Sequence, residues 1–274
     1  MPFTPSHAVV ALPFVRTRLV PAAIAVGAMT PDLPLFVRGT PFQYGLTHDL
    51  RWLPLTALVA LALFVVWRLV LRPAAGELTP AWVAARLPIT WGRGFRAAVR
   101  ETFPASWRGA LALGASLLLG VVSHIVWDAF THEGRLGTVL VPALGDMWGP
   151  FEGYRWLQYG SGAAGLLVLA VWGLRWLWLR HPHPVVRSLP TAVPIAWWAS
   201  LPVVLMVAWG WGLAELGPFT AAFTPAHLGY RVLPPACAAW GTLTVVLCIA
   251  ITARSRAVPR DSADRAVDTP GIRR

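Results

Sequence analysis

Residues 121–134 read Val-Val-Ser-His-Ile-Val-Trp-Asp-Ala-Phe-Thr-His-Glu-Gly and close a long apolar run. They carry His124, Asp128 and His132, spaced four residues apart. In an α-helix this spacing puts all three on nearly one face. Imidazoles and a carboxylate on one face can ligate a metal ion, and such polar groups are costly beside lipid unless something compensates them. We therefore predict a helix that carries half of a metal site.

One ion need not bind all three side chains, because eight residues of helix rise about 12 Å. The helix can end near Gly134 and turn His132 inward, or His132 can serve a second ion. A different interpretation is that the three side chains only satisfy each other's polar groups between helices. The sequence leaves these alternatives open.

The composition indicates an all-α, polytopic helical membrane protein. The chain has 274 residues, of which 56% are hydrophobic and 13% are charged, whereas a soluble domain carries about 25% charged residues. The net charge is +11, but the Arg residues cluster at the ends of apolar runs, which is how membrane topology is set. No basic face with interleaved aromatic residues is evident, so we expect no nucleic-acid partner. The lipid bilayer is the expected partner, and the oligomeric state is left open.

Five apolar runs are predicted to span the membrane: residues 55–71, 109–130, 162–179, 194–216 and 232–252. The Arg-rich connector 72–108 is typical of a cytoplasmic loop, which also puts the C-terminus in the cytoplasm. Two Gly/Pro-rich stretches, 31–54 and 131–160, are expected to be loops. We predict one membrane domain over residues 1–253, divided into an N-terminal part (1–53) and a bundle (54–253). A polar, disordered tail is expected over residues 254–274.

The first apolar run is interrupted by Arg16 and Arg18 and by Pro13 and Pro21. A single straight span would hold two Arg at membrane depth, at roughly 2.5 kcal/mol or more each. Two short helices in a re-entrant or interfacial hairpin fit better. This hairpin would return Asp32 to the side on which the chain begins.

Topology is expected to gather the ionisable residues on the outer face. His48 and Asp49 come just before the first span, and His124, Asp128 and His132 close the second. Because successive spans are antiparallel, these two ends lie on the same side. His7 and Asp32 join them if the hairpin forms, although a lone interfacial His is more often structural.

Other residues on this side suggest chemistry beyond metal binding. Asp49 or Glu133 is the expected general base of a metal-assisted reaction. Arg geometry suits phosphate recognition, whether of a substrate or of a lipid headgroup. The arginines expected on the outer side are Arg38, Arg51, Arg135 and Arg155.

Four short motifs carry a resemblance: Met-Pro-Phe-Thr-Pro-Ser-His at 1–7, Thr-Pro-Asp-Leu at 30–33, Thr-His-Asp at 47–49, and Ser-His-x-x-x-Asp-x-x-Thr-His at 123–132. Together they resemble an uncharacterised bacterial membrane-protein family, classed as a domain of unknown function. That family is similar in pattern to the YdjM-like membrane-bound metal-dependent hydrolases, and more distantly to the zinc-dependent phospholipase C fold. The resemblance covers residues 1 to about 180.

The resemblance implies a set of metal ligands, namely His7, Asp32, His48, His124 and Asp128. The chain departs from the phospholipase pattern, because no matching His-x-x-x-Glu follows. The departure leaves a full three-metal site in doubt.

Two functions follow from these observations. The first is an integral membrane hydrolase that uses a divalent metal, with Zn²⁺ favoured by the mixed His and Asp ligands, on a phosphoester or lipid-linked substrate at the outer face of the cell membrane. The second is a non-enzymatic membrane protein, such as a transporter or assembly factor, whose polar residues line a pathway or stabilise helix packing.

Overall fold

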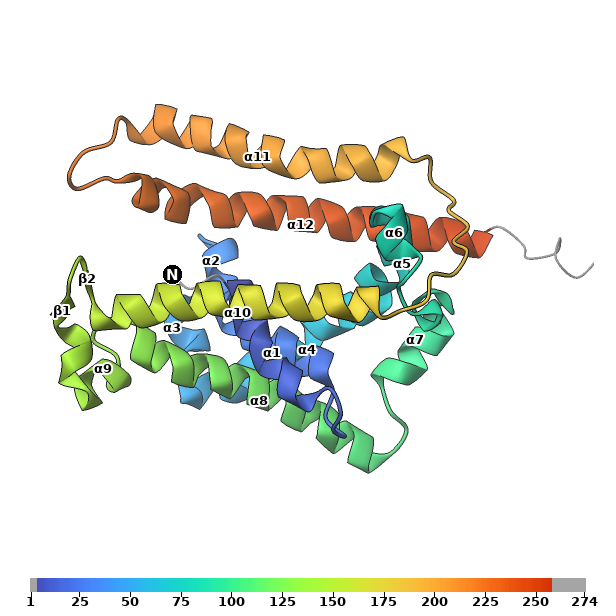
Figure 1. The fold of residues 1–274 in the computed structure, drawn as a ribbon, viewed down its shortest axis with the longest axis horizontal. Coiled ribbons are helices and arrows are strands. Elements are labelled where there is room, and N and C mark those ends of the chain that lie inside the picture. Colours follow the sequence, from blue (N-terminus) through green and yellow to red (C-terminus); the bar gives the residue numbers. More distant parts are fainter. Residues whose placement is uncertain (1–3, 258–274) are drawn as a thin grey trace, which may run out of the picture.

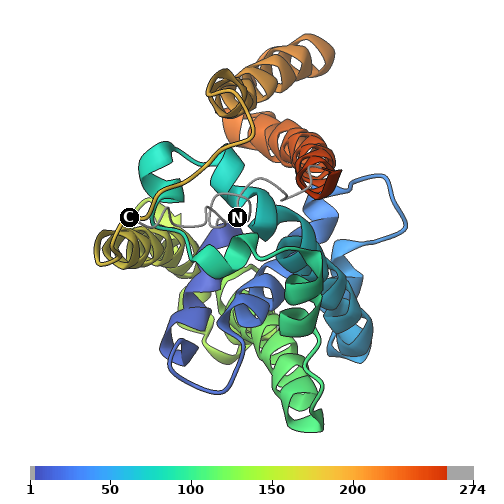
Figure 2. The ribbon, with the colours of Figure 1, turned by 90° about the vertical axis from the view of Figure 1, so that its right-hand side faces the viewer.

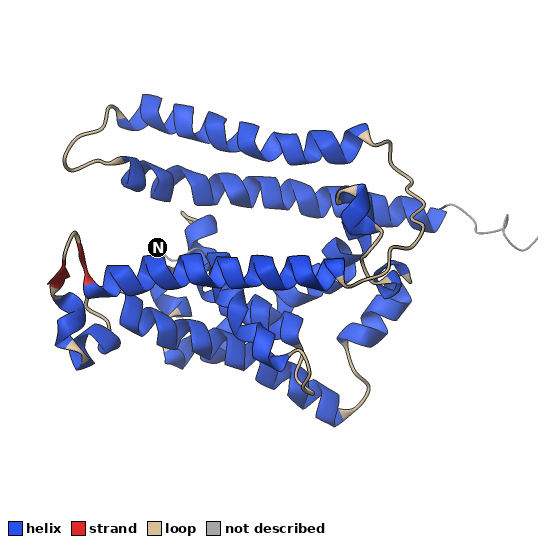
Figure 3. Ribbon diagram, viewed as in Figure 1, coloured by secondary structure: helices blue, strands red, loops and turns tan. Residues whose placement is uncertain are grey.

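The computed structural model describes residues 4–257, and helices make up most of it (Figures 1 and 3). Five helical stretches are long and apolar enough to cross a membrane: Leu50–Leu78, Trp107–Thr131, Gly153–Trp178, Ala192–Leu216 and Pro225–Arg254. The predicted fold class, five spans preceded by short N-terminal helices, is confirmed. The protein is a multi-pass membrane protein.

The N-terminal hairpin consists of a 3₁₀-helix, η1 (Thr4–Phe14), and a short α-helix, α1 (Pro21–Met29). Arg16 and Arg18 are exposed in the turn between them, as expected if they cannot enter an apolar core. Pro21 begins α1, where its missing N–H costs no helical hydrogen bond. With nine residues, α1 is about 13 Å long and too short to span a bilayer.

The stretch expected as a loop before the first span contains four short helical turns: η2 (Thr30–Asp32), α2 (Leu33–Phe36), α3 (Tyr44–Thr47) and η3 (Leu50–Trp52). The first span continues through α4 (Leu53–Val66), a π-helical turn, η4 (Trp67–Leu71), and α5 (Arg72–Leu78). The connector that follows is also largely helical, with α6 (Ala81–Ala84), η5 (Ile89–Gly92) and α7 (Phe95–Thr102).

The first span ends later than the sequence predicts because Arg72 is buried and pairs with Glu101. Arg72 is only 4% exposed, and its guanidinium donates to the Glu101 carboxylate of α7 over 2.6 Å. Arg68 donates to the Glu101 backbone carbonyl over 2.8 Å. The ion pair lets the helix continue through a charge that, by sequence alone, marks its end.

The rest of the described chain contains four long helices and a small β-hairpin. The elements are α8 (Trp107–Thr131), α9 (Leu136–Leu140), η6 (Pro142–Gly145), β1 (Met147–Trp148), β2 (Phe151–Glu152), α10 (Gly153–Trp178), α11 (Ala192–Leu216) and α12 (Pro225–Ala257). The expected loop 131–160 is therefore wrong in its last part, because α10 starts at Gly153. The predicted span lacks the first turns of α10, because Arg155 and Gln158 make these turns polar. The predicted tail begins inside α12, and its residues 258–274 lie outside the described part of the chain.

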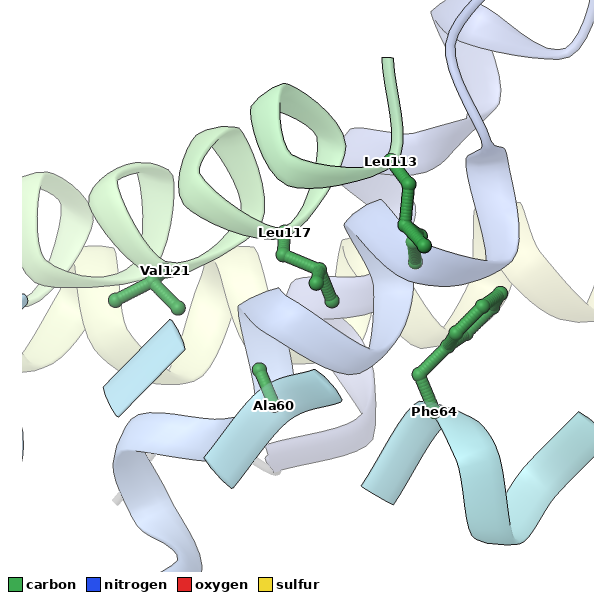
Figure 4. Close-up of a cluster of buried hydrophobic side chains, with 6 residues drawn as sticks. Ala60, Phe64, Leu113, Leu117 and Val121 are labelled. Carbon is green, nitrogen blue, oxygen red and sulfur yellow. The ribbon is translucent and has the colours of Figure 1, made fainter. Parts of the chain in front are cut away.

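The N-terminal hairpin packs among three longer helices. Helix α1 packs on α4 and α8, and η1 packs on α1 and α10. Figure 4 shows Ala60 and Phe64 of α4 facing Leu113, Leu117 and Val121 of α8 across this core.

Two glycines let α1 and α8 approach closely. A Cβ at Gly120 would lie 2.2 Å from the Ile24 carbonyl oxygen, and one at Gly27 would lie 2.5 Å from the Leu117 carbonyl oxygen. Small residues commonly permit such crossings between membrane helices.

Helices α11 and α12 form an antiparallel pair to one side of the other long helices, and α12 packs on α2, η4 and α5 (Figures 1 and 2). The pair is tied internally by the stacked rings of Trp197 and Trp240, 4.9 Å apart. It joins the first span through Trp198, whose indole N–H donates to the Leu78 carbonyl over 2.7 Å. The buried His and Asp residues all belong to the N-terminal hairpin, the stretch of short helical turns that follows it, and α8.

Candidate metal centre

Three segments bring one buried cluster together: η2, the residue that follows α3, and two successive turns of α8. Asp32, His48, His124 and Asp128 are all buried, and they offer ligand atoms that lie within 4.8 Å of one another. We call these four residues the His/Asp cluster. His48, His124 and Asp128 come from the two span ends that were expected to meet, and the structure brings these three residues together. Asp32 joins them from the end of the N-terminal hairpin, as expected if that hairpin forms.

In both imidazoles of the cluster, Nδ1 lies within hydrogen-bond distance of a backbone carbonyl oxygen. His124 Nδ1 lies 2.7 Å from the Ala28 oxygen, and His48 Nδ1 lies 3.0 Å from the Tyr44 oxygen. A carbonyl oxygen can only accept, so both Nδ1 atoms must carry the proton. In a neutral imidazole the other nitrogen, Nε2, then presents a bare lone pair.

Those two Nε2 atoms face each other at 3.2 Å. Each also lies 3.4 Å from Asp128 Oδ2, and His124 Nε2 lies 3.6 Å from Asp32 Oδ1. Lone pairs and carboxylate oxygens thus converge on one buried point. Such an arrangement is repulsive unless positive charge, as a metal ion or as protons on the imidazoles, occupies it.

Both carboxylates of the cluster are held by hydroxyl groups. Thr4 donates to Asp32 Oδ2 over 2.6 Å, and Tyr44 donates to Asp128 Oδ2 over 3.1 Å. Metal ligands are commonly oriented by partners of this kind. Neither hydroxyl was singled out from the sequence. The signal available for Tyr44 was its position four residues before His48, one helical turn away.

His7 lies beside the cluster. Its ring stacks on that of His124 with centroids 4.0 Å apart, and its Nε2 lies 3.7 Å from Asp128 Oδ1. Among the described residues, both of these buried atoms lack a hydrogen-bond partner. Burial lowers the pKa of His7 to about 4, so its imidazole is neutral near pH 7 and can act as a ligand.

His132 occupies the rim of the site. Its Nδ1 lies 3.2 Å from the Asp128 carbonyl oxygen and 3.6 Å from Asp128 Oδ2, while its Nε2 lies 3.1 Å from the Gln158 amide nitrogen of α10. Burial lowers the pKa of His132. Its predicted role as a ligand stays a prediction: Nδ1 lies against Asp128 and Nε2 lies against Gln158, outside the His/Asp cluster.

The two predicted general bases have other contacts. The Asp49 carboxylate accepts from the Arg51 amide over 2.9 Å and so caps η3. Glu133 is exposed and accepts from the Tyr154 hydroxyl over 3.4 Å. Their catalytic roles stay predictions.

The predicted phosphate-binding arginines are spread around this end of the molecule. Arg135 lies over the ring of Tyr44, 5.8 Å from its centroid. Arg38 lies over Tyr230 at 3.9 Å, Arg155 pairs with Glu152 at 3.0 Å, and Arg51 is exposed. Arg135 is therefore linked to the cluster through Tyr44, whose hydroxyl binds Asp128.

These observations define a class: an all-helical, multi-pass membrane protein with a buried His/Asp cluster compatible with a metal site. The chain belongs to the family described as a domain of unknown function (DUF4184), whose model matches residues 1–253. No curated protein matches the chain, and no solved structure does. The expected membership of an uncharacterised membrane family is confirmed. The resemblance to YdjM-like hydrolases and to the phospholipase C fold stays a prediction.

Proposed function

We propose that this protein is a membrane-bound, metal-dependent hydrolase. One divalent cation would be held by Asp32, His48, His124 and Asp128, with His7 within reach as a further ligand. The observation that carries the proposal is the pair of Nε2 lone pairs facing each other between two buried carboxylates. Two imidazoles and carboxylate oxygens suit Zn²⁺, and each His donating Nδ1–H to a carbonyl is the usual support for a ligating imidazole.

When bound, a divalent metal would supply Lewis acidity and lower the pKa of a coordinated water. The protein's own groups would prepare that chemistry. Tyr44 holds the Asp128 carboxylate, and Thr4 holds that of Asp32. Arg135 would bind an anionic oxygen of the substrate, and Asp49 or Glu133 would accept a proton.

We further propose that the substrate is a phosphoester or another lipid-linked bond at the outer face of the cell membrane, with the C-terminus in the cytoplasm. The support is the Arg excess of the connector, which favours a cytoplasmic position for it. The cluster lies at the opposite ends of the first two spans from this connector. An end of a span lies near the lipid headgroups.

A second candidate function is a non-enzymatic membrane protein in which protons, not a metal, neutralise the cluster. Imidazoles and carboxylates within spans are typical of proton and ion pathways. Here the two His would be imidazolium partners of Asp32 and Asp128. The same distances support this alternative, so metal content decides between the two.

The experiment compares metal per chain in purified parent protein with that in His124→Ala, His48→Ala and the double variant. We expect about one Zn²⁺ or other divalent ion per parent chain, lost in each single variant, with the double variant no worse than either. His181→Ala, at an exposed residue far from the cluster in sequence, is the control and should keep its metal.

Undiminished metal in both single variants, or none in a folded parent, would contradict the metal site. Catalysis is tested separately with p-nitrophenyl phosphorylcholine in mixed micelles. Metal binding without chelator-sensitive hydrolysis of this phosphodiester would keep the metal site and contradict its proposed catalytic role.

A further inference from the structure

A half-open cavity of about 340 Å³ lies directly beside the His/Asp cluster. It is lined by Ser6, His7, Val9, Val10, Ser123, Trp127 and Ser161. These residues belong to η1, α8 and α10, which pack against each other. His7 is shared, because it forms a wall of the cavity and also stacks on His124. The cavity and the cluster are therefore direct neighbours, with the His7 side chain between them.

The unusual helix type of η1 shapes this cavity. Residues three apart are eclipsed in a 3₁₀-helix, so Ser6 lies above Val9 and His7 lies above Val10. These two columns provide all four η1 residues of the lining. In an α-helix, residues three apart are instead offset by about 60° around the helix axis.

The walls are largely apolar, and two of their three serines use their hydroxyl groups within the protein. The Ser123 hydroxyl donates to the Gly120 carbonyl over 2.7 Å. The Ser161 hydroxyl donates to the Gln158 carbonyl over 3.4 Å and accepts from the Trp127 indole N–H over 3.1 Å. Hydroxyls already satisfied in this way have little need of water, and apolar cavities stay dry or bind apolar molecules. The volume exceeds twice the roughly 150 Å³ of a benzene-binding cavity.

The depth of the cavity indicates which apolar molecule reaches it. With 25 residues, α8 is about 38 Å long, so it exceeds a hydrocarbon core of about 30 Å by about 4 Å at each end. Asp128 lies three residues before the end of α8, near the edge of that core. Ser123 and Ser161 lie eight residues from the helix ends, about 12 Å along the helix and thus at the depth of acyl chains.

We infer that the cavity holds an alkyl chain of a membrane lipid, whose polar headgroup then lies at the His/Asp cluster. The chain enters sideways from the bilayer between α8 and α10, past Trp127, which is 40% exposed. The headgroup then lies near the membrane surface, where the cluster is, and the alkyl chain lies deeper, where the cavity is. The inference rests on the proposed function for what happens at the headgroup, and it makes a membrane lipid the substrate class.

The test uses a phosphatidylcholine that carries a photoreactive diazirine in its acyl chain, mixed into vesicles of unlabelled phosphatidylcholine that contain the protein. After irradiation, adducts are mapped by mass spectrometry. We expect adducts at Val9, Val10 and Trp127 in clear excess over those at Met206 and Val207, although these two residues of α11 are more exposed, at 65% each.

Val10→Trp fills the cavity and should lower the adducts at Val9 and Trp127 at least fivefold, with the yield on α11 unchanged. Val126→Trp is the matched control, because Val126 is exposed on α8 outside the lining; it should change nothing. Val9→Phe is the second cavity variant if Val10→Trp does not fold. Cavity adducts no more frequent than those on α11 in the parent, or undiminished in a folded cavity variant, would overturn the inference.

This measurement requires neither metal nor turnover, so the two proposals can fail separately. Cavity labelling in a parent that holds no metal would reject the hydrolase proposal and keep the lipid site. Stoichiometric metal without cavity labelling would reject the lipid site alone. The His124→Ala variant should lose metal and keep its cavity adducts.

Discussion

The Tyr44 side chain is placed to tune the cluster without belonging to it. Its ring stacks on His48 with centroids 3.7 Å apart, its hydroxyl donates to Asp128, and its backbone carbonyl accepts from His48 Nδ1. One residue therefore orients two proposed ligands. Burial raises the pKa of the Tyr44 hydroxyl, and the Asp128 charge raises it further, so this hydroxyl keeps its proton and remains a donor.

Tyr44→Phe should weaken metal binding about 10–100-fold, the usual effect of removing a group that orients a ligand. The ring stacking and the backbone carbonyl remain, so the protein should still fold and still bind metal. Competition with a chelator of known affinity measures the change. Tyr159→Phe, at an exposed tyrosine of α10, is the control; equal affinity in both variants would show that the Tyr44 hydroxyl does not act on the site.

At the scale of elements, the crossing of α1 and α8 fixes the cluster. The Ala28 carbonyl that orients His124 lies at the end of α1, next to the contact made by Gly27 and Gly120. A side chain at this crossing pushes α1 away from α8, since the obstructing atoms are backbone. The orientation of His124 thus depends on two residues that carry no functional group.

Gly120→Ala should therefore release metal and lower the thermal midpoint, although it touches no ligand. Gly114→Ala on the same helix meets open space, and it should leave metal content unchanged and stabilise slightly, because Ala favours helix over Gly. Metal analysis and thermal unfolding in detergent are the measurements. If Gly120→Ala retained full metal content, the close crossing would not control the site.

The elements that could be predicted from the sequence are those with a strong single signal. Long apolar runs gave the five spans, and Arg16 with Arg18 gave the break in the N-terminal hairpin. Alternation of antiparallel spans gave the meeting of His48 with His124. The helix ends predicted near Arg72 and Gln158 are wrong, because each of these polar residues is buried within a helix that continues past it. Whether a charged residue ends a helix depends on a distant partner such as Glu101, which no local pattern reveals.

The details of the site depend on contacts between segments far apart in the chain. Thr4 reaches Asp32 across 28 residues, and Tyr44 reaches Asp128 across 84. Neither residue belongs to a spaced pattern of ligands. The 3₁₀ geometry of η1, which shapes the cavity, has no signature that distinguishes it from a short α-helix.

At the scale of the whole molecule, the cluster and the Arg-rich connector lie at opposite ends of the first two spans. If the connector is cytoplasmic, a single cysteine at Arg93 should react with a membrane-impermeant maleimide only after the membrane is opened. A cysteine at Gly145 should react in intact cells. Both are introduced with Cys237 and Cys248 replaced by Ala. Labelling of both from the same side would contradict the five-span topology, and a reversed pattern would contradict the proposed orientation.

The N-terminal hairpin of η1 and α1 has a consequence for biosynthesis. Ala28 and His124 are 96 residues apart, so at roughly 5–20 residues per second the ribosome needs about 5–20 seconds to make the second after the first. During that delay His7 and Asp32 have no partners from α8, and entering the bilayer alone would be costly. The newborn hairpin is therefore expected to wait at the membrane surface until α8 arrives, which makes its docking a late event in assembly.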